Sequence, residues 1–374
     1  MSGNKRYSRR RMIQLSGAAT LTGLAGCLGG GNDEAGEGEF TDLTISMWGG
    51  PLTEGNREVF IEPFEDEHGI EISIQEHSNA FDVLSQVRQG QEVHGGIFDD
   101  FSLLDAYNDG MLVPIDTDIV TGLDDFFLDF VLDRPGAPGD EPHSVMSGLF
   151  PGGAFYDEDV VSEMSSWEDI LLNEDLEGSF ALLSNVPFYL PYTIAYSLDI
   201  DLNEALDGAT QSEADDIMDQ VWERLEDITE RATDFGNDGN VISLASDGTI
   251  DAGQLAAGDA FNVAEDSDRS LVPFIPEEGI FANTSPWAIF DDTTNAGQAY
   301  TMQELIAFTL DRERRAEYAT DHLSYIQGVD WGEFGNPMEG NPEQEHIDRI
   351  NIVDPTVVNE FGEEWELTQR DIIQ

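Results

Sequence analysis

The chain reads Leu43-Thr44-Ile45-Ser46-Met47-Trp48 and then Gly49-Gly50-Pro51, so an alternating apolar and polar run ends in turn-forming residues. Alternation with a period of two predicts a β-strand. Residues 54–68 follow with apolar side chains at roughly helical spacing, and Gly69 stands where the C-terminus of a helix favours glycine. The first two elements are therefore predicted to be a strand and a helix.

The same order of elements repeats directly afterwards. Residues 70–74 predict a second strand, residues 80–90 a helix capped by Ser78 or Asn79, and residues 97–98 a short third strand. Strands that alternate with helices in this way predict an α/β fold with a parallel, doubly wound sheet, whose ligands bind outside the carboxyl ends of the strands. The apolar face of the second helix is expected to comprise Phe81, Leu84 and Val87.

The length of the chain predicts two lobes, because the roughly 330 residues that follow the N-terminal segment exceed what one hydrophobic core usually holds. We expect residues 41–147 and 281–325 to form the first lobe, and residues 148–280 and 326–374 to form the second. Further elements are expected as a capped helical turn at 166–171, a strand at 178–183, a long amphipathic helix at 213–235, strands at 271–276 and 287–290, and a helix at 296–310.

The N-terminal segment has the pattern of a membrane-targeting signal. Five cations, Arg9 and Arg10 among them, precede an apolar run that is too short to span about 30 Å of hydrocarbon as a helix. The residues around Arg9 and Arg10 resemble a twin-arginine export signal, and those before Cys27 resemble the lipobox of a lipoprotein. We predict a signal over residues 1–27, lipid attachment at Cys27 and a flexible, acidic and glycine-rich tether over residues 28–40. The folded part is then expected to be lipid-anchored at the extracellular face of the cell membrane.

The charge of the chain indicates the solvent in which it works. The formal net charge is −61, and without the five cations before Cys27 it is 11 − 77 = −66, since every acidic residue follows Cys27. Frequent tryptophans and a 40% hydrophobic content favour a folded core over acidic disorder. The composition is typical of an extreme halophile, in which concentrated salt screens the repulsion. A single acidic residue is therefore expected to be solvated surface, and nucleic acid is not expected as a partner.

Four segments resemble the solute-binding proteins of ABC importers. They are the strand at 45–48, the helix and strand at 63–72, the Ser-Trp-Glu-Asp-Ile-Leu segment at 166–171 with the residues behind it, and residues 275–281 leading into a helix. Over most of its length the chain is thus similar to the periplasmic or extracellular solute-binding lipoproteins of this class, and among them to the spermidine/putrescine-binding branch.

This resemblance implies an α/β, two-lobed periplasmic-binding-protein fold, type II-like, with a ligand cleft between the lobes. Closure of the lobes on a small solute would present it to a membrane permease and its ATPase. A monomer is expected, and neither a cofactor nor a metal is predicted. Because Cys27 is the only cysteine, no disulfide is expected within the folded body.

The resemblance also implies which residues line the cleft. Trp48 matches the tryptophan that stacks on the ligand, and Asp99, which would otherwise cap a helix, stands with Phe101 at the end of the third strand. Most carboxylates of the polyamine binders are replaced by neutral polar groups, which suit a small organic solute that is polyamine-like or otherwise nitrogenous. A cationic amine would be held by Asp99 or Glu265 and by the face of Trp48. The predicted ligand-binding residues are Trp48, Asp99, Phe101, Asn185, Phe188, Tyr189, Glu265, Asn283, Thr284 and Ser285.

Two other classes of function are weighed against this prediction. The chain has no nucleophile elbow, zinc-protease helix, phosphate loop or cysteine nucleophile, so we do not expect an enzyme, although a pair of glycosidase carboxylates could hide among so many acids. The six histidines lack ligand spacing and are expected to be structural or surface residues. A surface or adhesion lipoprotein remains the main alternative, but it would not need a two-lobed body with aromatic loop ends.

Overall fold

A computed structural model describes residues 38–134, 141–321, 329–330 and 348–374, all within one compact unit. Its strands are β1 (Leu43–Trp48), β2 (Ile72–His77), β3 (Gly95–Ile97), β4 (Ser144–Asp157), β5 (Phe180–Leu183), β6 (Asp234–Gly236), β7 (Ala252–Ala256), β8 (Leu271–Phe274), β9 (Ile280–Ile289) and β10 (Ile350–Ile352).

The helices are α1 (Pro51–Asn56), α2 (Glu62–His68), α3 (Ala80–Arg88), α4 (Asp100–Asn108), α5 (Leu123–Phe126), α6 (Asp129–Leu132), α7 (Trp167–Leu171), α8 (Tyr189–Tyr196), α9 (Leu202–Leu206), α10 (Gln211–Thr229), α11 (Asp238–Ser246), α12 (Ala257–Asp266), α13 (Ala296–Phe308), α14 (Arg312–Asp321) and α16 (Pro355–Ile373). A π-helical turn, Arg57–Ile61, joins α1 to α2, and a 3-10 turn spans Glu174–Leu176.

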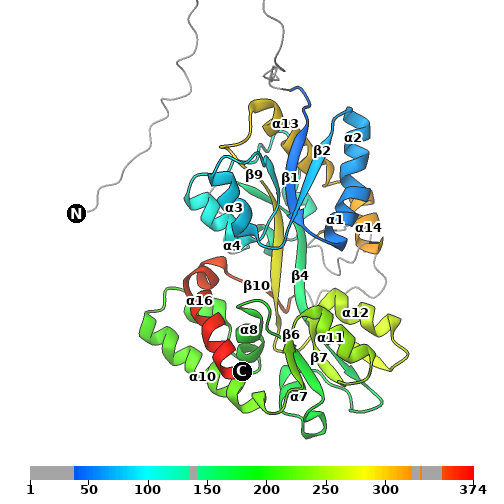
Figure 1. Ribbon diagram of the computed structural model, residues 1–374, viewed down its shortest axis with the longest axis vertical. Coiled ribbons are helices and arrows are strands. Elements are labelled where there is room, and N and C mark those ends of the chain that lie inside the picture. The colour runs from blue at the N-terminus through cyan, green and yellow to red at the C-terminus, as the bar shows by residue number, and fades with distance from the viewer. Residues whose placement is uncertain (1–37, 135–140, 322–328, 331–347) are drawn as a thin grey trace, which may run out of the picture. The chain divides into compact units, whose positions relative to one another are not determined.

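The strands follow one hydrogen-bonded path in the order β2-β1-β3-β9-β4-β7-β5-β6, with β10 beside β9 and β8 beside β4. We call the group around β1, β2 and β3 the first lobe and the group around β5, β6 and β7 the second lobe. Figure 1 shows β4 and β9 side by side and shared by the two groups. The predicted parallel order of the first three strands is confirmed, because β1 pairs in parallel with both β2 and β3.

Local sequence signals set the ends of several elements. Gly69 ends α2 in the left-handed conformation with φ of 68°, as predicted for a glycine at this position. Asn79 caps α3 by accepting a hydrogen bond from the backbone N–H of Phe81. Ser166 and Asp169 form a capping box at the start of α7. These elements therefore begin or end where the sequence predicts.

The helix predicted for residues 213–235 is too long. It ends at Thr229, and residues 234–236 form β6 instead. The backbone N–H of Thr233 already donates to the carbonyl of Phe180, and β6 then pairs in parallel with β5. Pairing with a distant strand overrides the local helical pattern at this point, and it brings a third strand end to the second lobe.

Two further predictions are corrected. Phe81, predicted on the apolar face of α3, is 44% exposed, because Ala80 and Val83 turn to the core together with Leu84 and Val87. Val329, which the predicted boundaries assign to the second lobe, packs in the hydrophobic core of the first and pairs with Phe127. The remaining lobe boundaries stay a prediction.

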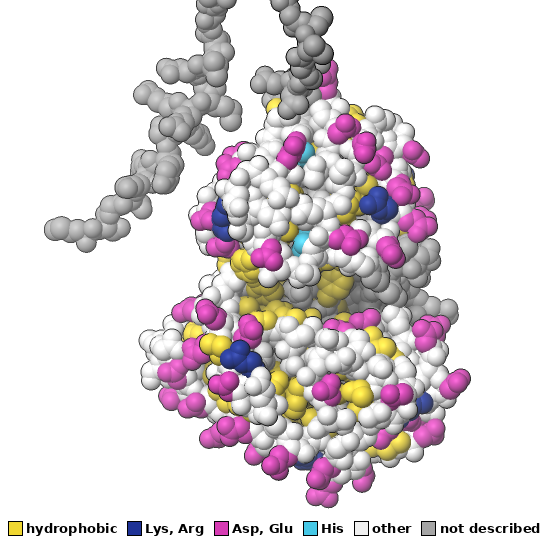
Figure 2. Space-filling view, viewed as in Figure 1, with side chains coloured by type: hydrophobic (Ala, Val, Ile, Leu, Met, Phe, Trp, Pro, Cys, Tyr) yellow, Lys and Arg dark blue, Asp and Glu magenta, His cyan; other side chains and the backbone are white. Residues whose placement is uncertain are grey.

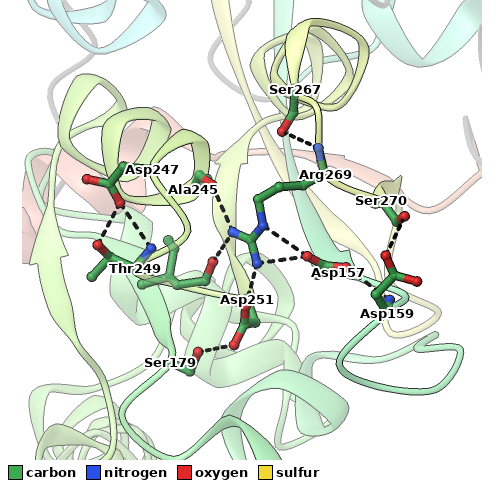
Figure 3. A network of polar contacts seen from close by, with 11 residues as sticks. Asp157, Asp159, Ser179, Ala245, Asp247, Thr249, Asp251, Ser267, Arg269 and Ser270 are labelled. Atoms are coloured by element: carbon green, nitrogen blue, oxygen red, sulfur yellow. Dashed lines mark hydrogen bonds and ion pairs between the residues drawn. The ribbon is translucent and has the colours of Figure 1, made fainter.

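Arg269 ties together the part of the second lobe around β4, β7 and β8 (Figure 3). Its Nε donates to Asp157 at 2.9 Å, and its Nη2 contacts both Asp157 and Asp251. Its Nη1 donates to the carbonyl oxygens of Ala245 at 2.8 Å and Ile250 at 2.6 Å. Every nitrogen of the guanidinium is thus engaged, and such forked, charge-assisted geometry is specific to arginine.

We predict that Arg269→Lys lowers the free energy of unfolding by about 2 kcal/mol, because an ammonium retains one charge contact but cannot span two carboxylates and two carbonyls. Arg88→Lys is the matched control, since Arg88 is 37% exposed where it pairs with Asp105 and Asp109. Exposed pairs are worth about 1 kcal/mol or less. Denaturant unfolding in concentrated salt measures both variants, and equal losses would contradict the prediction.

Candidate functional site

The directions of the strands show which end of the first lobe faces the second. Strand β4 starts in the first lobe, where Ser144 pairs with Ala288, and reaches the second lobe at Gly152, where it begins to pair with β7. Strand β9 runs antiparallel to β4, and β3 runs antiparallel to β9 with Gly95 opposite Ile289. Since β1 and β2 are parallel to β3, the carboxyl ends of all three strands point toward the second lobe.

The strand ends of the second lobe point the opposite way. Strand β7 is antiparallel to β4, with Ala256 opposite Gly152 and Ala252 opposite Tyr156, so β7 ends beside the first lobe. Strand β5 is parallel to β7, and β6 is parallel to β5. We call the region where both sets of carboxyl ends meet the inter-lobe site. On the face shown in Figure 2, hydrophobic side chains gather in the hollow between the lobes, whereas acidic side chains are spread over both.

Trp48 and His77 end β1 and β2 at this site. They are register partners, and their ring centroids lie 4.6 Å apart. His77 also stacks on Phe98, with centroids 5.4 Å apart and an interplanar angle of 7°. Burial lowers the pKa of His77 to about 4, so the ring is neutral at neutral pH. Trp48 thus lies at the inter-lobe edge, and it is joined there by a histidine that the sequence did not single out.

Asp99 serves the helix that follows it. Its carboxylate accepts a hydrogen bond from the backbone N–H of Ser102 at 2.7 Å and caps α4. The residue is 7% exposed, and this burial raises the pKa of its carboxyl group. In this structure, therefore, the carboxylate of Asp99 acts as a helix cap, which is the alternative to ligand binding that the sequence left open.

Four aromatic residues connect the lobes. Phe101, in α4, lies against Phe188 with ring centroids 5.1 Å apart, and Asn359 of α16 donates to the carbonyl oxygen of Phe101 at 3.1 Å. Phe188 and Tyr189 both contact Phe281 at the start of β9, and Tyr189 stacks on it with centroids 5.0 Å apart. The structure thus brings the predicted residues Phe101, Phe188 and Tyr189 together.

Asn283, Thr284 and Ser285 lie within β9 rather than in a loop. Thr284 is 2% exposed, and its hydroxyl hydrogen-bonds the carboxylate of Asp100, which also pairs with buried Arg134 at 3.1 Å. Ser285 is buried as well, whereas Asn283 is half-buried. Thr284 is therefore held by a structural network, and Asn283 is the most accessible of the three to a ligand.

Two other predicted residues are exposed. Asn185 lies in the loop after β5, at the inter-lobe site. Glu265 lies near the C-terminal end of α12, six residues after Asp259 in the first helical turn, which corresponds to about 9 Å along the axis. The structure does not bring Glu265 to the strand ends.

A pair of carboxylates that the sequence analysis missed lies at the second-lobe strand ends. Asp238 begins α11 after β6, and Asp259 lies in the first turn of α12 after β7, on either side of Tyr189 at the start of α8. Burial, followed by the charges of Asp238 and Asp259, raises the pKa of Tyr189. Burial and then the charge of Asp238 raise the pKa of Asp259 to about 6. We call Asp238 and Asp259 the acidic pair.

Two local features of the sequence explain why the acidic pair was not predicted. The helix predicted through residue 235 concealed β6, and Ala252–Ala256 is too rich in small residues to predict a strand. The position of each aspartate two or three residues after the end of a strand, in the first turn of the next helix, would have been the signal. Among 77 acidic residues, an aspartate without that context does not stand out.

Among the residues that the structure describes, no three or more histidine, cysteine, aspartate or glutamate side chains come close enough to hold a metal ion. No helix in the described ranges combines the length and apolar character needed to cross a membrane.

Comparison with protein families identifies the class. The family model of bacterial extracellular solute-binding proteins matches residues 60–327. The chain therefore belongs to the bacterial extracellular solute-binding proteins, as the resemblance in its sequence predicted. No curated protein matches the chain in sequence.

Solved structures agree on the fold. The spermidine/putrescine ABC transporter substrate-binding protein PotD of Streptococcus pneumoniae is similar, with a TM-score of 0.70 at 18% identity over 89% of this chain and 100% of that one. An ABC transporter substrate-binding protein from Bradyrhizobium japonicum gives 0.71 at 15% identity, over 89% and 100%. The TpPotD lipoprotein of Treponema pallidum gives 0.70 at 16% identity, over 89% and 99%. The predicted two-lobed periplasmic-binding-protein fold is confirmed.

The acidic pair yields a prediction for stability. At pH 7 the ionised Asp259 is partly desolvated beside Asp238, so Asp259→Asn should stabilise the free protein, by on the order of 2 kcal/mol. Asp266→Asn, an exposed change at the other end of the same helix, should have little effect. Denaturant unfolding at pH 7 compares the two variants. A destabilised Asp259→Asn protein would contradict the proposed desolvation.

The raised pKa of Asp259 also determines how the stability of the protein depends on pH. The folded-state pKa of about 6 lies above the ordinary value, near 3.9 for an unfolded aspartate, so the folded state binds the extra proton between about pH 4 and 6. The contribution of Asp259 to stability is therefore full below about pH 4 and is lost as the pH rises through 6. Unfolding measured from pH 4 to 8 should show this loss in the wild type and not in Asp259→Asn.

Proposed function

We propose that the protein captures a small cationic, nitrogenous solute for an ABC importer. The observation that carries the proposal is the acidic pair, which lies beside Tyr189 at strand ends that face the first lobe. A half-buried carboxylate next to a like charge favours a cation, because the cation relieves both the repulsion and the lost hydration. The solved relative from Streptococcus pneumoniae, named for spermidine and putrescine, supports a nitrogenous ligand.

Both lobes would contribute to binding. Asp238 and Asp259 would hold an ammonium group, Tyr189, supported from behind by buried Phe188, would cover its carbon chain, and Trp48 would close over the solute from the first lobe. A ligand that contacts both lobes only when they close shifts the population toward the closed form. A permease could then recognise the loaded protein by the arrangement of its lobes. None of these roles requires a chemical reaction, so we propose a receptor rather than an enzyme.

The remaining parts of the proposal concern residues outside the described ranges. Arg9 and Arg10 would direct export, and the lipid on Cys27 would hold the protein, as a monomer, at the extracellular face of the membrane near its permease and ATPase. The Treponema pallidum relative, which is a lipoprotein, supports the anchor. The net charge supports a saline environment.

The anchor has a direct test. Cys27→Ser should release the protein into the medium, because the modified cysteine is the proposed point of attachment. Binding of solute by the released protein should be unchanged. Fractionation of cells that express each form, followed by immunoblotting, measures the distribution. Retention of Cys27→Ser on the membrane would show that another segment anchors the chain.

The solute class can be found by a thermal-shift screen in concentrated salt with polyamines, sugars, amino acids, quaternary amines, thiamine and ferric complexes. A ligand at a hundredfold excess over Kd stabilises the native state by about 2.7 kcal/mol. We expect a saturable shift with a cationic nitrogenous compound, and we expect Trp48→Ala and Asn283→Ala to weaken its binding about tenfold or more. Unchanged affinity in both variants would remove the inter-lobe site from the proposal. An intact fold that responds to no compound would favour the adhesion alternative.

A further inference from the structure

Two ring nitrogens at the first-lobe edge of the inter-lobe site have no hydrogen-bond partner among the described residues. They are Nε1 of Trp48 and Nε2 of His77, and both atoms are buried. Buried polar atoms are nearly always hydrogen-bonded, since an unpaired one loses its hydration without replacement. The two rings are in contact, with centroids 4.6 Å apart, so both nitrogens belong to one small region at the ends of β1 and β2.

The hydrogen bonds of Ser46 determine which nitrogen of His77 carries the proton. The hydroxyl of Ser46, which is fully buried, donates its only proton to the carbonyl oxygen of Gln75 at 2.9 Å. The contact of 2.8 Å between that hydroxyl and Nδ1 of His77 is a second hydrogen bond if Nδ1–H donates it, and we assign this tautomer because it satisfies both contacts of Ser46. Because burial keeps the ring neutral, with a pKa of about 4, Nε2 carries no proton and is an acceptor. The indole N–H of Trp48 is a donor only.

We propose that Trp48 Nε1–H and His77 Nε2 act together as a donor–acceptor pair that binds one end of the solute. This inference rests on the proposed function and specifies its ligand. The end that binds here must both accept and donate a hydrogen bond, as a hydroxyl or a carboxamide does. An ammonium group offers donors only and would leave the indole N–H unpaired.

The acidic pair of the second lobe suits a different chemical group. Asp238 and Asp259 are acceptors with negative charge, and they suit an ammonium group. The two ends of the site therefore differ, in contrast to the two equal ends of a simple diamine. The geometry points to a solute with a cationic amine at one end and a neutral hydroxyl or carboxamide at the other, that is, an amino alcohol or an amino amide.

A matched series of probes tests this inference on the full-length protein in concentrated salt. The probes are putrescine, aminobutanol and aminobutanamide, which share a carbon chain and differ at one end. Titration calorimetry should show that the wild type binds a neutral-ended probe about tenfold more tightly than putrescine, since a buried polar group left unpaired costs about that much. The readout is the ratio of the two affinities, which a general loss of stability would not change.

Two variants remove one member of the pair each. Trp48→Phe keeps the aromatic ring without the N–H, and His77→Asn keeps a donor toward Ser46 without the acceptor at Nε2. Each should bring the ratio to within about threefold of one. His68→Asn is the matched control, because His68 lies at the end of α2 against Phe40 and should leave the ratio as in the wild type.

The outcomes separate this inference from the proposed function. If the wild type binds putrescine as tightly as the neutral-ended probes, or if both variants keep the preference, the pair holds only water and the inference is wrong, while binding of a cationic solute still stands. If none of these probes binds and none of the wider panel does, the proposed function fails and the inference fails with it.

Discussion

The antiparallel pairing of β4 with β9 is the interaction on which the rest of the structure depends. Both strands pass from one lobe to the other, and their register fixes which strand ends face each other.

A buried arginine holds the irregular part of this pairing. The register shifts between Met146 and Gly148, and the carbonyl oxygens of Met146 and Ser147 accept hydrogen bonds there from Arg315. Arg315 is 1% exposed, and among the described residues no carboxylate pairs with it. Burial lowers its pKa to about 10, so the guanidinium remains charged and backbone carbonyls stabilise it in place of an acid.

The shared strands also position the aromatic cluster. Phe281 lies at the start of β9, and a Cβ on Gly152 of β4 would come within 3.2 Å of its ring. The absence of a side chain at Gly152 therefore leaves room beside β4 for the tip of the Phe281 ring, which stacks on Tyr189 from the second lobe. Because Tyr189 lies beside the acidic pair, a displacement of Phe281 would reach the residues proposed to hold the cation.

The part of the fold that could be predicted is the part specified by local signals. The first three strands and their helices follow from period-two alternation and from caps such as Asn79 and Ser166, which act within a few residues. Strand β4 could not be recognised, because it is buried on both faces and lacks the alternation that marks a half-buried strand. The role of Thr284 could not be predicted either, because it also lies in a strand buried on both faces. Its hydroxyl bonds Asp100, a residue 184 positions away, whereas the sequence predicts a contact with ligand. Among the site residues, Trp48 and Tyr189 were predictable from strand ends, whereas His77 and the acidic pair required the strand pairing.

Net charge and local charge act differently in this protein. The 77 acidic residues surround the molecule with negative potential, but at multimolar salt this potential decays within about 3 Å and cannot steer a distant cation. Asp259 is shielded from that screening because it is half-buried beside Asp238. Its attraction for a cation would therefore persist in the saline solvent that we propose for this protein, where the attraction of the surface is screened. In such a medium, selectivity for the proposed solute would come from burial and geometry at the strand ends, where the proposed hydrogen-bonding groups of the two lobes differ.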